Sequence, residues 1–352
     1  MTKTIIPNVA GARTAYLVLG MHRSGTSAIT QLLALAGAQL PENVMPGDEH
    51  NAKGYFEPWK IAIFNDQRLR AGGSAWDDVF AFPYSRLTAR QERSWVNRAT
   101  ALFEAEFGGA TFPLMKDPRV SLLLPLWRTA LDELDIAPRC VISVRHPLAV
   151  ADSLSKRNGF PIEKSVLLWV TYMLAAEAHT RDLPRVFVSY DELLGDWRAQ
   201  GARIEAAHEA ALPRLTRQAG KEIDAFLSTD LRHSPGQGDL AAVPQVGALA
   251  NAVYDWCMAA ARDHRLDGAP LASGTQDLIE MKQRMGAFVS PVTKDLDATR
   301  TELLEVRQRQ DFERKGRRRL EAEIGRLEAE IARLQAERAA VGSLLDRLLS
   351  EG

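Results

Sequence analysis

Cysteine is scarce in this chain, since only Cys140 and Cys257 occur among 352 residues. Two cysteines cannot form the network of disulfide bonds that stabilises small secreted domains. The seven histidines are scattered along the chain and lack the short spacing that is typical of a zinc site. We therefore expect neither a disulfide-rich secreted protein nor a bound metal ion.

An excess of charge of one sign is also missing. The chain has 44 Lys and Arg against 45 Asp and Glu, which gives a formal net charge of −1. A nucleic-acid-binding protein usually carries a marked basic excess, so we expect no nucleic-acid partner. Any site that binds an anion must depend on a local group of cations.

Long hydrophobic runs are absent as well. The longest candidate, 166–176, is shorter than the ~20 apolar residues of a membrane span, and it contains Thr171 and Tyr172. The first residues show no apolar core followed by a small-residue cleavage site. We expect no transmembrane segment, no export signal and a cytoplasmic location.

Composition divides the chain into two parts. All seven Trp lie at or before Trp256, whereas 20 of the 39 residues from Arg300 to Arg338 are charged. Apolar residues in and around the charged part follow one heptad register, which predicts a coiled coil, with a single solvated helix as the alternative. We predict a globular domain over 1–271, a linker with a short helix over 272–293 and a coiled coil over 294–352. The heptad residues are Leu296, Leu303, Val306, Leu320, Ile324, Leu327, Ile331, Leu334, Val341, Leu345 and Leu348.

Four short apolar runs alternate with helical patterns in the first part of the chain. They are Tyr16–Gly20, Thr111–Met115, Cys140–Val144 and Val186–Val188. Strands separated by helices favour a parallel sheet that is covered on both faces and binds ligands at the carboxyl ends of its strands. The predicted fold class is α/β, with a parallel sheet flanked by helices and followed by a C-terminal coiled-coil helix.

A glycine-rich turn, Gly20-Met21-His22-Arg23-Ser24-Gly25-Thr26-Ser27, follows the first apolar run. Its Gly-x4-Gly frame is typical of a P-loop, whose backbone N–H groups face an anion. A nucleoside triphosphatase would have Lys at position 26. Here that residue is Thr26, and the cation of the loop is Arg23. Arg145 also stands where an acidic residue would hold magnesium. The loop therefore favours a nucleotide whose transferred group is not a γ-phosphate.

Residues 15–233 resemble the sulfotransferase family, which transfers sulfonate from 3′-phosphoadenosine 5′-phosphosulfate (PAPS) to hydroxyl or amino groups. The segment 23–27 is similar to the family's 5′-phosphosulfate loop, and Arg145 with Ser153 is similar to its 3′-phosphate motif. The resemblance implies that PAPS is the co-substrate and that no metal takes part. Tyr190 belongs to a pattern similar to the family's Tyr-Glu-Asp-Leu. The implied PAPS-binding residues are Arg23, Ser24, Gly25, Thr26, Ser27, Arg145, Ser153 and Tyr190.

A third motif, Lys116-Asp117-Pro118-Arg119, looks like the Lys-Asp-Pro turn of protein-tyrosine sulfotransferases. The resemblance implies that Lys116 contacts the transferring sulfonate. Together with Arg23, it would supply positive charge to the leaving phosphate. We expect Asp117 to fix the turn or to pair with Arg119 rather than to react.

The acceptor hydroxyl must lose a proton, so a general base is expected beside it. The family uses His or Glu for this step, and we predict Glu57, which precedes a helix that begins after Pro58. Glu49 and His50 are competing candidates in the same segment. His22 is a further alternative, although its position inside the loop favours a phosphate contact.

The acceptor is expected to be a saccharide or glycan. The chain departs from cytosolic small-molecule sulfotransferases, because 314–319 matches only the start of their Arg-Lys-Gly-x-x-Gly loop. It looks instead like bacterial sulfotransferase-like proteins associated with cell-surface glycan assembly. We expect acceptor specificity from segments 42–56 and 72–86, in which Trp76, Asp77 and Asp78 form either a sugar platform or a packed turn. Residues 157–159 are expected near the adenine.

Two other functions stay open at this point. One is a P-loop kinase or phosphotransferase that acts on a small molecule. The other is an inactive scaffold that displays its coiled coil to glycan-assembly partners. In each case the coiled coil would join a second copy of the chain or a partner protein, and the basic run 314–319 would be able to touch an anionic membrane or glycan.

Overall fold

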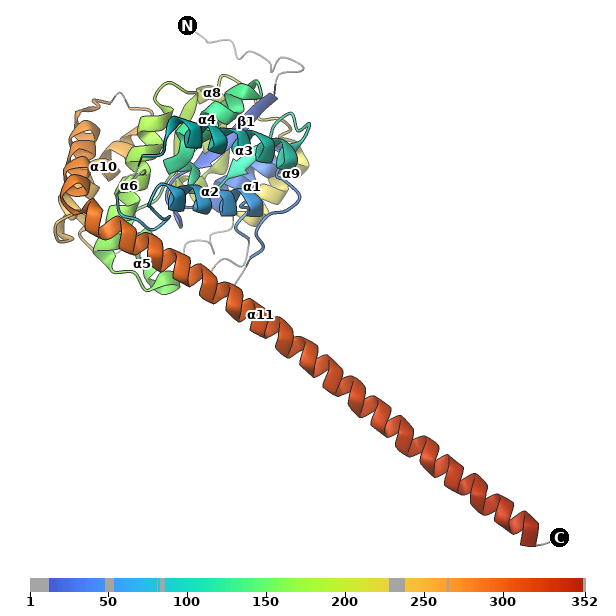
Figure 1. Cartoon of the computed structure of the whole chain (residues 1–352). Helices are drawn as coiled ribbons and strands as arrows, with labels where there is room; N and C mark the ends of the chain where they lie inside the picture. Colours follow the sequence, from blue (N-terminus) through green and yellow to red (C-terminus); the bar gives the residue numbers. More distant parts are fainter. Residues whose placement is uncertain are drawn as a thin grey trace. The chain divides into compact units, whose positions relative to one another are not determined.

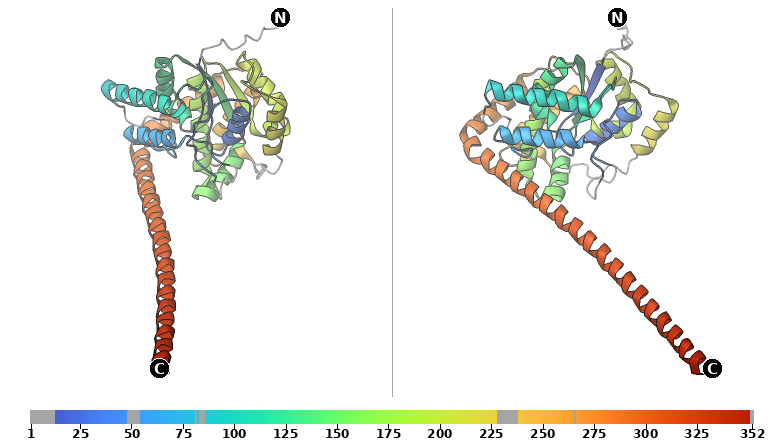
Figure 2. Two further views of the ribbon diagram at one scale, coloured as in Figure 1. Left: turned by 90° about the vertical axis from the view of Figure 1, so that its right-hand side faces the viewer. Right: turned by 45° about the vertical axis from the view of Figure 1, so that its right-hand side comes forward.

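The computed structural model describes residues 13–47, 54–80, 82, 86–227, 238–264 and 266–350, with side chains described up to residue 342. The described chain forms two compact units, Met1–Lys294 and Asp295–Gly352. The helices of the first unit surround its sheet, as Figures 1 and 2 show. None of the described helices contains a stretch long and apolar enough to cross a membrane.

The sheet has four parallel strands in the order β2-β1-β3-β4, which confirms the predicted α/β class. The strands are β1 (Arg13–Leu19), β2 (Leu114–Lys116), β3 (Ile136–Val144) and β4 (Arg185–Ser189). Val18 is paired with Lys116, and Val144 is paired with Ser189. The carboxyl ends of the strands therefore meet at one edge, where an α/β sheet binds its ligands.

Side chains alternate between the two faces of β1, as the period of a strand requires. Leu17 and Leu19 join one buried cluster, whereas Tyr16 and Val18 join another. All four are buried, which explains why the strand is a continuous apolar run. The first cluster also contains residues from 61–176 and 240–278, and the second also contains residues from 28–38 and 186–227.

The helices follow the strands in alternation. Their bounds are α1 (Thr26–Leu35), α2 (Trp59–Ala71), α3 (Ala89–Phe107), α4 (Val120–Glu133), α5 (Pro147–Asn158), α6 (Ile162–Thr180), α7 (Tyr190–Gly195), α8 (Trp197–Ala207), α9 (Arg217–Phe226), α10 (Gly247–Ala260) and α11 (Ala269–Ser350). A short 3-10 turn, Leu240–Ala242, precedes α10. Helices α1, α4, α5 and α7 each begin just after a strand, so their N-termini lie at the ligand-binding edge.

The segment 272–293 is helical throughout, as part of α11, rather than a linker with a short helix inside it. Leu271 and Leu278 are buried in the core of the first unit, and this packing explains why the segment continues as helix. In the second unit, the heptad residues from Leu296 to Val341 are exposed on a single helix. The domain boundaries and the coiled coil remain predictions.

Candidate active site

The loop between β1 and α1 has the backbone shape that its glycines predict. Gly20 and Gly25 have φ values of 127° and 91°, which non-glycine residues rarely adopt. A Cβ atom at Gly25 would lie 2.1 Å from Cδ2 of the Tyr190 ring. The loop therefore lies directly against the start of α7, and glycine is required there both for its φ value and for the space.

Two serines outside the loop hold its backbone. Ser143, in β3, donates to the carbonyl oxygen of Ser24 at 2.6 Å, and the N–H of Gly20 donates to Oγ of Ser121, in α4, at 2.9 Å. Sequence reasoning did not identify either residue. A Ser near the end of an apolar strand is the only local signal for Ser143, and nothing local indicates Ser121.

Two buried polar atoms of the loop lack a hydrogen-bond partner among the described residues. They are Oγ of Ser24 and Nε2 of His22. Ser24 is 0% exposed and His22 is 7% exposed. A buried polar group without a partner is costly, so such atoms usually meet a ligand or a water molecule. Both atoms are therefore suited to contact a bound anion or hydroxyl group.

The loop and the predicted 3′-phosphate motif are in direct contact. Nε of Arg23 donates to Oγ of Ser153, in α5, at 2.7 Å, and the Arg145 guanidinium donates to the carbonyl oxygen of Arg23 at 2.9 Å. Arg145 also lies 4.9 Å from the centroid of the Tyr190 ring. Burial lowers the pKa of Arg145, and the nearby charge of Arg23 lowers it further. Residues from four separate elements thus form one cationic site.

Ser27 and Thr26, the other predicted PAPS-binding residues of the loop, each make a different contact within the chain. Oγ of Ser27 donates to the carbonyl oxygen of Tyr55 at 3.2 Å, which joins α1 to the segment before α2. Thr26 is buried, and its carbonyl oxygen accepts from Oγ1 of Thr30 at 2.8 Å. Neither contact uses the backbone N–H groups at the start of α1, where an anion is favoured.

The predicted catalytic residues Lys116 and Glu57 form a buried ion pair. Nζ of Lys116 lies 2.7 Å from Oε1 of Glu57, and it also donates to the carbonyl oxygen of Tyr55 at 2.9 Å. The two charged side chains are only 2% and 7% exposed. Lys116 ends β2 and Glu57 precedes α2, so the pair joins two segments that are distant in the sequence.

A second buried network holds Arg119 beside this pair. Its guanidinium lies 2.8 Å from Asp117, 2.7 Å from Asp66 and 3.6 Å from Oε2 of Glu57. Burial alone would lower the pKa of Arg119, but the three carboxylates raise it well above its usual value. Asp117 also accepts from the Arg119 N–H and from Asn65, so it both fixes the turn and pairs with Arg119.

A cavity of about 230 Å³ opens beside the ion pair. Its lining comes from five segments of the chain and combines apolar walls with charged groups. Burial lowers the pKa of His22 well below its usual value, and the charges of Arg119, Arg157, Lys116 and Arg23 lower it further, so the imidazole is neutral. The lining residues are His22, Met45, Tyr55, Glu57, Trp76, Arg119, Arg157 and Asn158.

The cavity is lined by residues that the sequence assigned to different parts of the site. Arg157 and Asn158, expected near the adenine, lie here with Glu57. Trp76 lines the cavity too, whereas Asp77 is bound to Lys164 at 2.8 Å. Glu49 and His50, the competing candidates for the base, lie outside the described residues.

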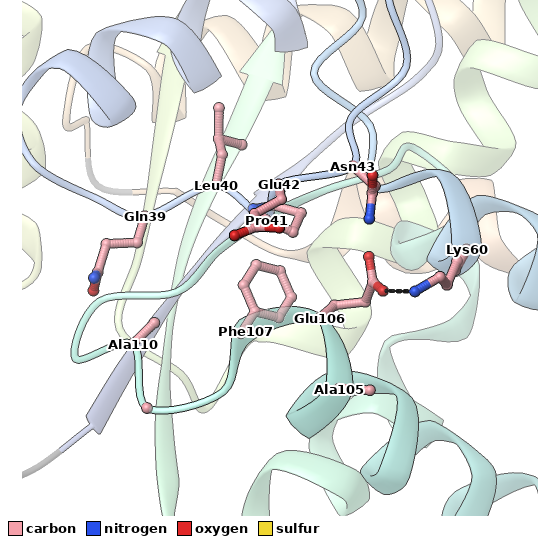
Figure 3. A pocket seen from close by; sticks show the side chains of 11 residues that line it. Gln39, Leu40, Pro41, Glu42, Asn43, Lys60, Ala105, Glu106, Phe107 and Ala110 are labelled. Carbon is pink, nitrogen blue, oxygen red and sulfur yellow. Dashed lines mark hydrogen bonds and ion pairs between the residues drawn. The ribbon is translucent and has the colours of Figure 1, made fainter.

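A different cavity, of about 460 Å³, is lined by a separate set of residues (Figure 3). Gln39 to Asn43 line one side, and α3 lines the other. Glu106, in α3, forms an ion pair with Lys60 at 2.7 Å. None of the predicted catalytic or PAPS-binding residues lines this cavity, although Glu42 and Asn43 of the predicted specificity segment 42–56 do.

The fold and the site together define a P-loop-type α/β protein with a cationic site at the carboxyl edge of its sheet. No protein-family model and no curated protein matches the sequence. Among solved structures, the sulfotransferase domain of the Synechococcus PCC 7002 olefin synthase is similar at 17% identity and a TM-score of 0.39, over 78% of this chain and 96% of that domain. The sulfotransferase domain of the curacin biosynthetic pathway is similar at 13% identity and a TM-score of 0.35, over 77% of this chain and 98% of that domain. We base the functional proposal on the residues of the site.

Proposed function

We propose that the chain is a sulfotransferase that moves a sulfonate group from PAPS to a hydroxyl group of a saccharide or glycan. The observation that best supports the proposal is the contact between Arg23 and Ser153. It joins a glycine-rich anion loop to a second cationic segment, which suits a nucleotide with anionic groups at two positions. Lysine is missing from the loop position that a nucleoside triphosphatase requires.

The residues of the site fit PAPS. Arg23, the unpartnered Oγ of Ser24 and the backbone N–H groups at the start of α1 would hold the 5′-phosphosulfate. Arg145 and Ser153 would hold the 3′-phosphate, because guanidinium groups bind phosphate through charge-assisted hydrogen bonds. Bound PAPS supplies an activated sulfonate and a phosphate leaving group.

The ion pair of Glu57 and Lys116 would supply the chemistry at the reacting hydroxyl. Glu57 accepts the hydroxyl proton as the acceptor oxygen attacks the sulfur atom. Lys116 and Arg23 stabilise the negative charge that remains on the phosphate oxygen when its bond to sulfur breaks. In the structure Lys116 holds one oxygen of Glu57, so the pair also fixes the orientation of the base.

Calorimetry with 3′-phosphoadenosine 5′-phosphate (PAP) and with adenosine 5′-phosphate tests the proposal. We expect PAP to bind about 10-fold or more tightly than the nucleotide without the 3′-phosphate, because of charged hydrogen bonds to Arg145. Arg145→Gln should remove the preference. The control Arg198→Gln, which changes an exposed arginine paired with Asp224, should keep it. Equal affinity of the wild type for the two nucleotides would contradict the proposal.

We further propose that 294–352 forms a coiled coil with a second copy of the chain or with a partner protein. The support is the exposed heptad series on α11. In this proposal the preceding residues, including the helical segment 272–293, carry the catalytic site and its connection to the coiled coil.

A further inference from the structure

We propose that Arg157 forms an acceptor subsite for an oxyanion, so that the acceptor carries a carboxylate or phosphate group near its reacting hydroxyl. The inference rests on the proposed function, because it assigns the cavity beside Glu57 to the acceptor. It adds the chemical class of that acceptor and names the residue that recognises it.

Arg157 has an unusual set of partners for a partly buried arginine. Its Nε donates to Oδ1 of Asn158 at 2.7 Å, and its guanidinium lies 5.4 Å from the centroid of the Trp76 ring. No carboxylate among the described residues lies within ion-pair distance of it. Other partly buried arginines do have such a partner, for example Arg185 with Glu177 and Arg203 with Asp263.

The surroundings of Arg157 oppose its charge. Burial lowers its pKa most, and the charges of Arg23 and Arg119 lower it further, whereas Tyr55 and the carboxylate of Glu57 offset part of this effect. A cation in such a place is stabilised when an anion binds beside it. Glu57, the carboxylate in the lining of the cavity, already pairs with Lys116 and Arg119, so Arg157 can still bind an anionic ligand.

Arg145 likewise has no carboxylate at ion-pair distance among the described residues. Arg145 contacts Tyr190 and the backbone of Arg23, on the side that the proposal gives to the nucleotide. Arg157 instead lines the cavity with Glu57 and Trp76. The two arginines thus suit two different anions, one on the donor and one on the acceptor.

The rest of the cavity suits a hydroxyl-rich ligand with an apolar face. Trp76 is held between His22, whose ring centroid lies 4.9 Å away, and Phe160, whose ring stacks at 5.8 Å. Tyr172 also donates to the Trp76 carbonyl oxygen at 2.7 Å, so the indole is a fixed wall. Nε2 of His22 is buried without a partner among the described residues, and it can bond to a ligand hydroxyl.

Three probes that differ at one position test the subsite. They are 4-nitrophenyl β-D-glucoside, the corresponding glucuronide and the corresponding 6-phosphate, each titrated calorimetrically into protein saturated with PAP. For the wild type we expect one or both anionic probes to bind about 10-fold or more tightly than the glucoside. The glucuronide and the 6-phosphate distinguish a carboxylate acceptor from a phosphate acceptor.

Variants at one position then assign the effect to Arg157. Arg157→Gln should make the three probes bind alike, and Arg157→Lys should restore part of the preference, while both variants bind PAP normally. Arg181→Gln, on an exposed arginine that is 56% accessible and paired with Glu177, is the matched control and should keep the full preference.

The outcomes separate this inference from the proposed function. Failure of the wild type to bind PAP would overturn the proposed function, and the inference with it. Normal PAP binding with no preference among the probes would overturn the inference alone. Weaker PAP binding by Arg157→Gln would place the residue in the donor site and would also overturn the inference.

Discussion

The arginines of the proposed site have different surroundings from the arginines of the second unit. In the second unit, Arg326 and Arg333 are more than half exposed and pair with glutamates one helical turn away. In the first unit, Arg145 and Arg157 are partly buried, and their hydrogen bonds go to a backbone carbonyl and an amide oxygen. The balance of 44 basic and 45 acidic residues conceals this difference. It is the distribution of the carboxylates, and not the total charge, that creates an anion site.

The two units also differ in what their charges contribute. Exposed ion pairs between neighbouring turns of a helix stabilise it only slightly, by about 0.3–0.5 kcal/mol each. A partly buried cation without a carboxylate opposes folding until an anion binds. Substitutions in the tail should therefore leave nucleotide binding unchanged, whereas substitutions at the site should change it strongly.

The largest expected effect is the loss of sulfonate transfer when the buried carboxylate of Glu57 is replaced. Glu57→Gln should lower the rate of sulfonate transfer from PAPS to the acceptor by about 10²–10⁴-fold, because the general base is lost. PAP binding should persist, since the amide that replaces the carboxylate keeps an oxygen that can accept from Lys116. A radiolabelled sulfonate-transfer assay measures the rate.

Glu106→Gln is the matched control for that experiment. Glu106 is equally buried and pairs with a lysine, but it lines the cavity of Figure 3. Its substitution should leave the transfer rate unchanged. Normal turnover by Glu57→Gln would show that the base is another residue, with Glu49, His50 and His22 as the candidates.

The next effect is a loss of stability in acid that belongs to the first unit. Burial lowers the pKa of His208 to about 4, while the unfolded chain titrates near 6.5. Between these values the unfolded state binds the extra proton, so His208 alone should lower the free energy of unfolding by about 3 kcal/mol as the pH falls from 6.5 to 4. Denaturant titrations followed by Trp fluorescence measure this, because every Trp lies at or before residue 256.

A variant assigns the acid effect to that histidine. His208→Asn removes the titrating group, so the fall in stability over the same pH range should become clearly smaller. The 295–352 segment contains no histidine. An unchanged pH dependence in the variant would assign the effect to other groups.

A smaller expected effect is a loss of PAP affinity, which should differ between the arginines of the two units. Arg23→Gln should weaken PAP binding by about 10- to 100-fold, because charge-assisted hydrogen bonds are lost. Arg333→Gln, in the tail, should leave the dissociation constant unchanged. Calorimetry measures both, and equal effects of the two substitutions would remove the distinction between the units.

The smallest expected effect is the change in stability when a glycine is replaced by alanine, which should have opposite signs in the two units. Gly25→Ala should destabilise the first unit by about 1–3 kcal/mol, because alanine is strained at this φ and its Cβ would meet the Tyr190 ring. Gly316 lies in α11, and a Cβ there meets nothing within 4 Å. Gly316→Ala should therefore stabilise the helix by about 0.5–1 kcal/mol. Thermal melting followed by circular dichroism measures both, and a stable Gly25→Ala protein would contradict the described loop packing.

Local patterns predict the part of the site that is close in sequence. Each of the four apolar runs overlaps a strand, although 111–113 lie before β2, and the glycines of the loop have the positive φ values that the motif requires. The spacing of Arg145 and Ser153, two turns of helix, also places Ser153 toward the loop, where it meets Arg23. In each case neighbouring residues determine the geometry.

Contacts between distant segments could not be predicted in the same way. Lys116 meets Glu57 across 59 positions, and Ser121 meets Gly20 across 101. Arg157 lies over Trp76 because α5 packs beside the segment after α2, which no local pattern reveals. The helical state of 272–293 likewise depends on the burial of Leu278 against the first unit, which overrides the glycine and serine signals in that segment.

The central claim is that cations of this chain hold a doubly anionic nucleotide without metal. Calorimetric titration of the full chain with PAP in the presence of a chelator tests it most directly, with ATP plus magnesium as the comparison. We predict saturable binding of PAP in the chelator, and weaker or no binding of ATP with magnesium. Absence of PAP binding without magnesium, together with tight binding of magnesium ATP, would contradict the claim and favour a phosphotransferase.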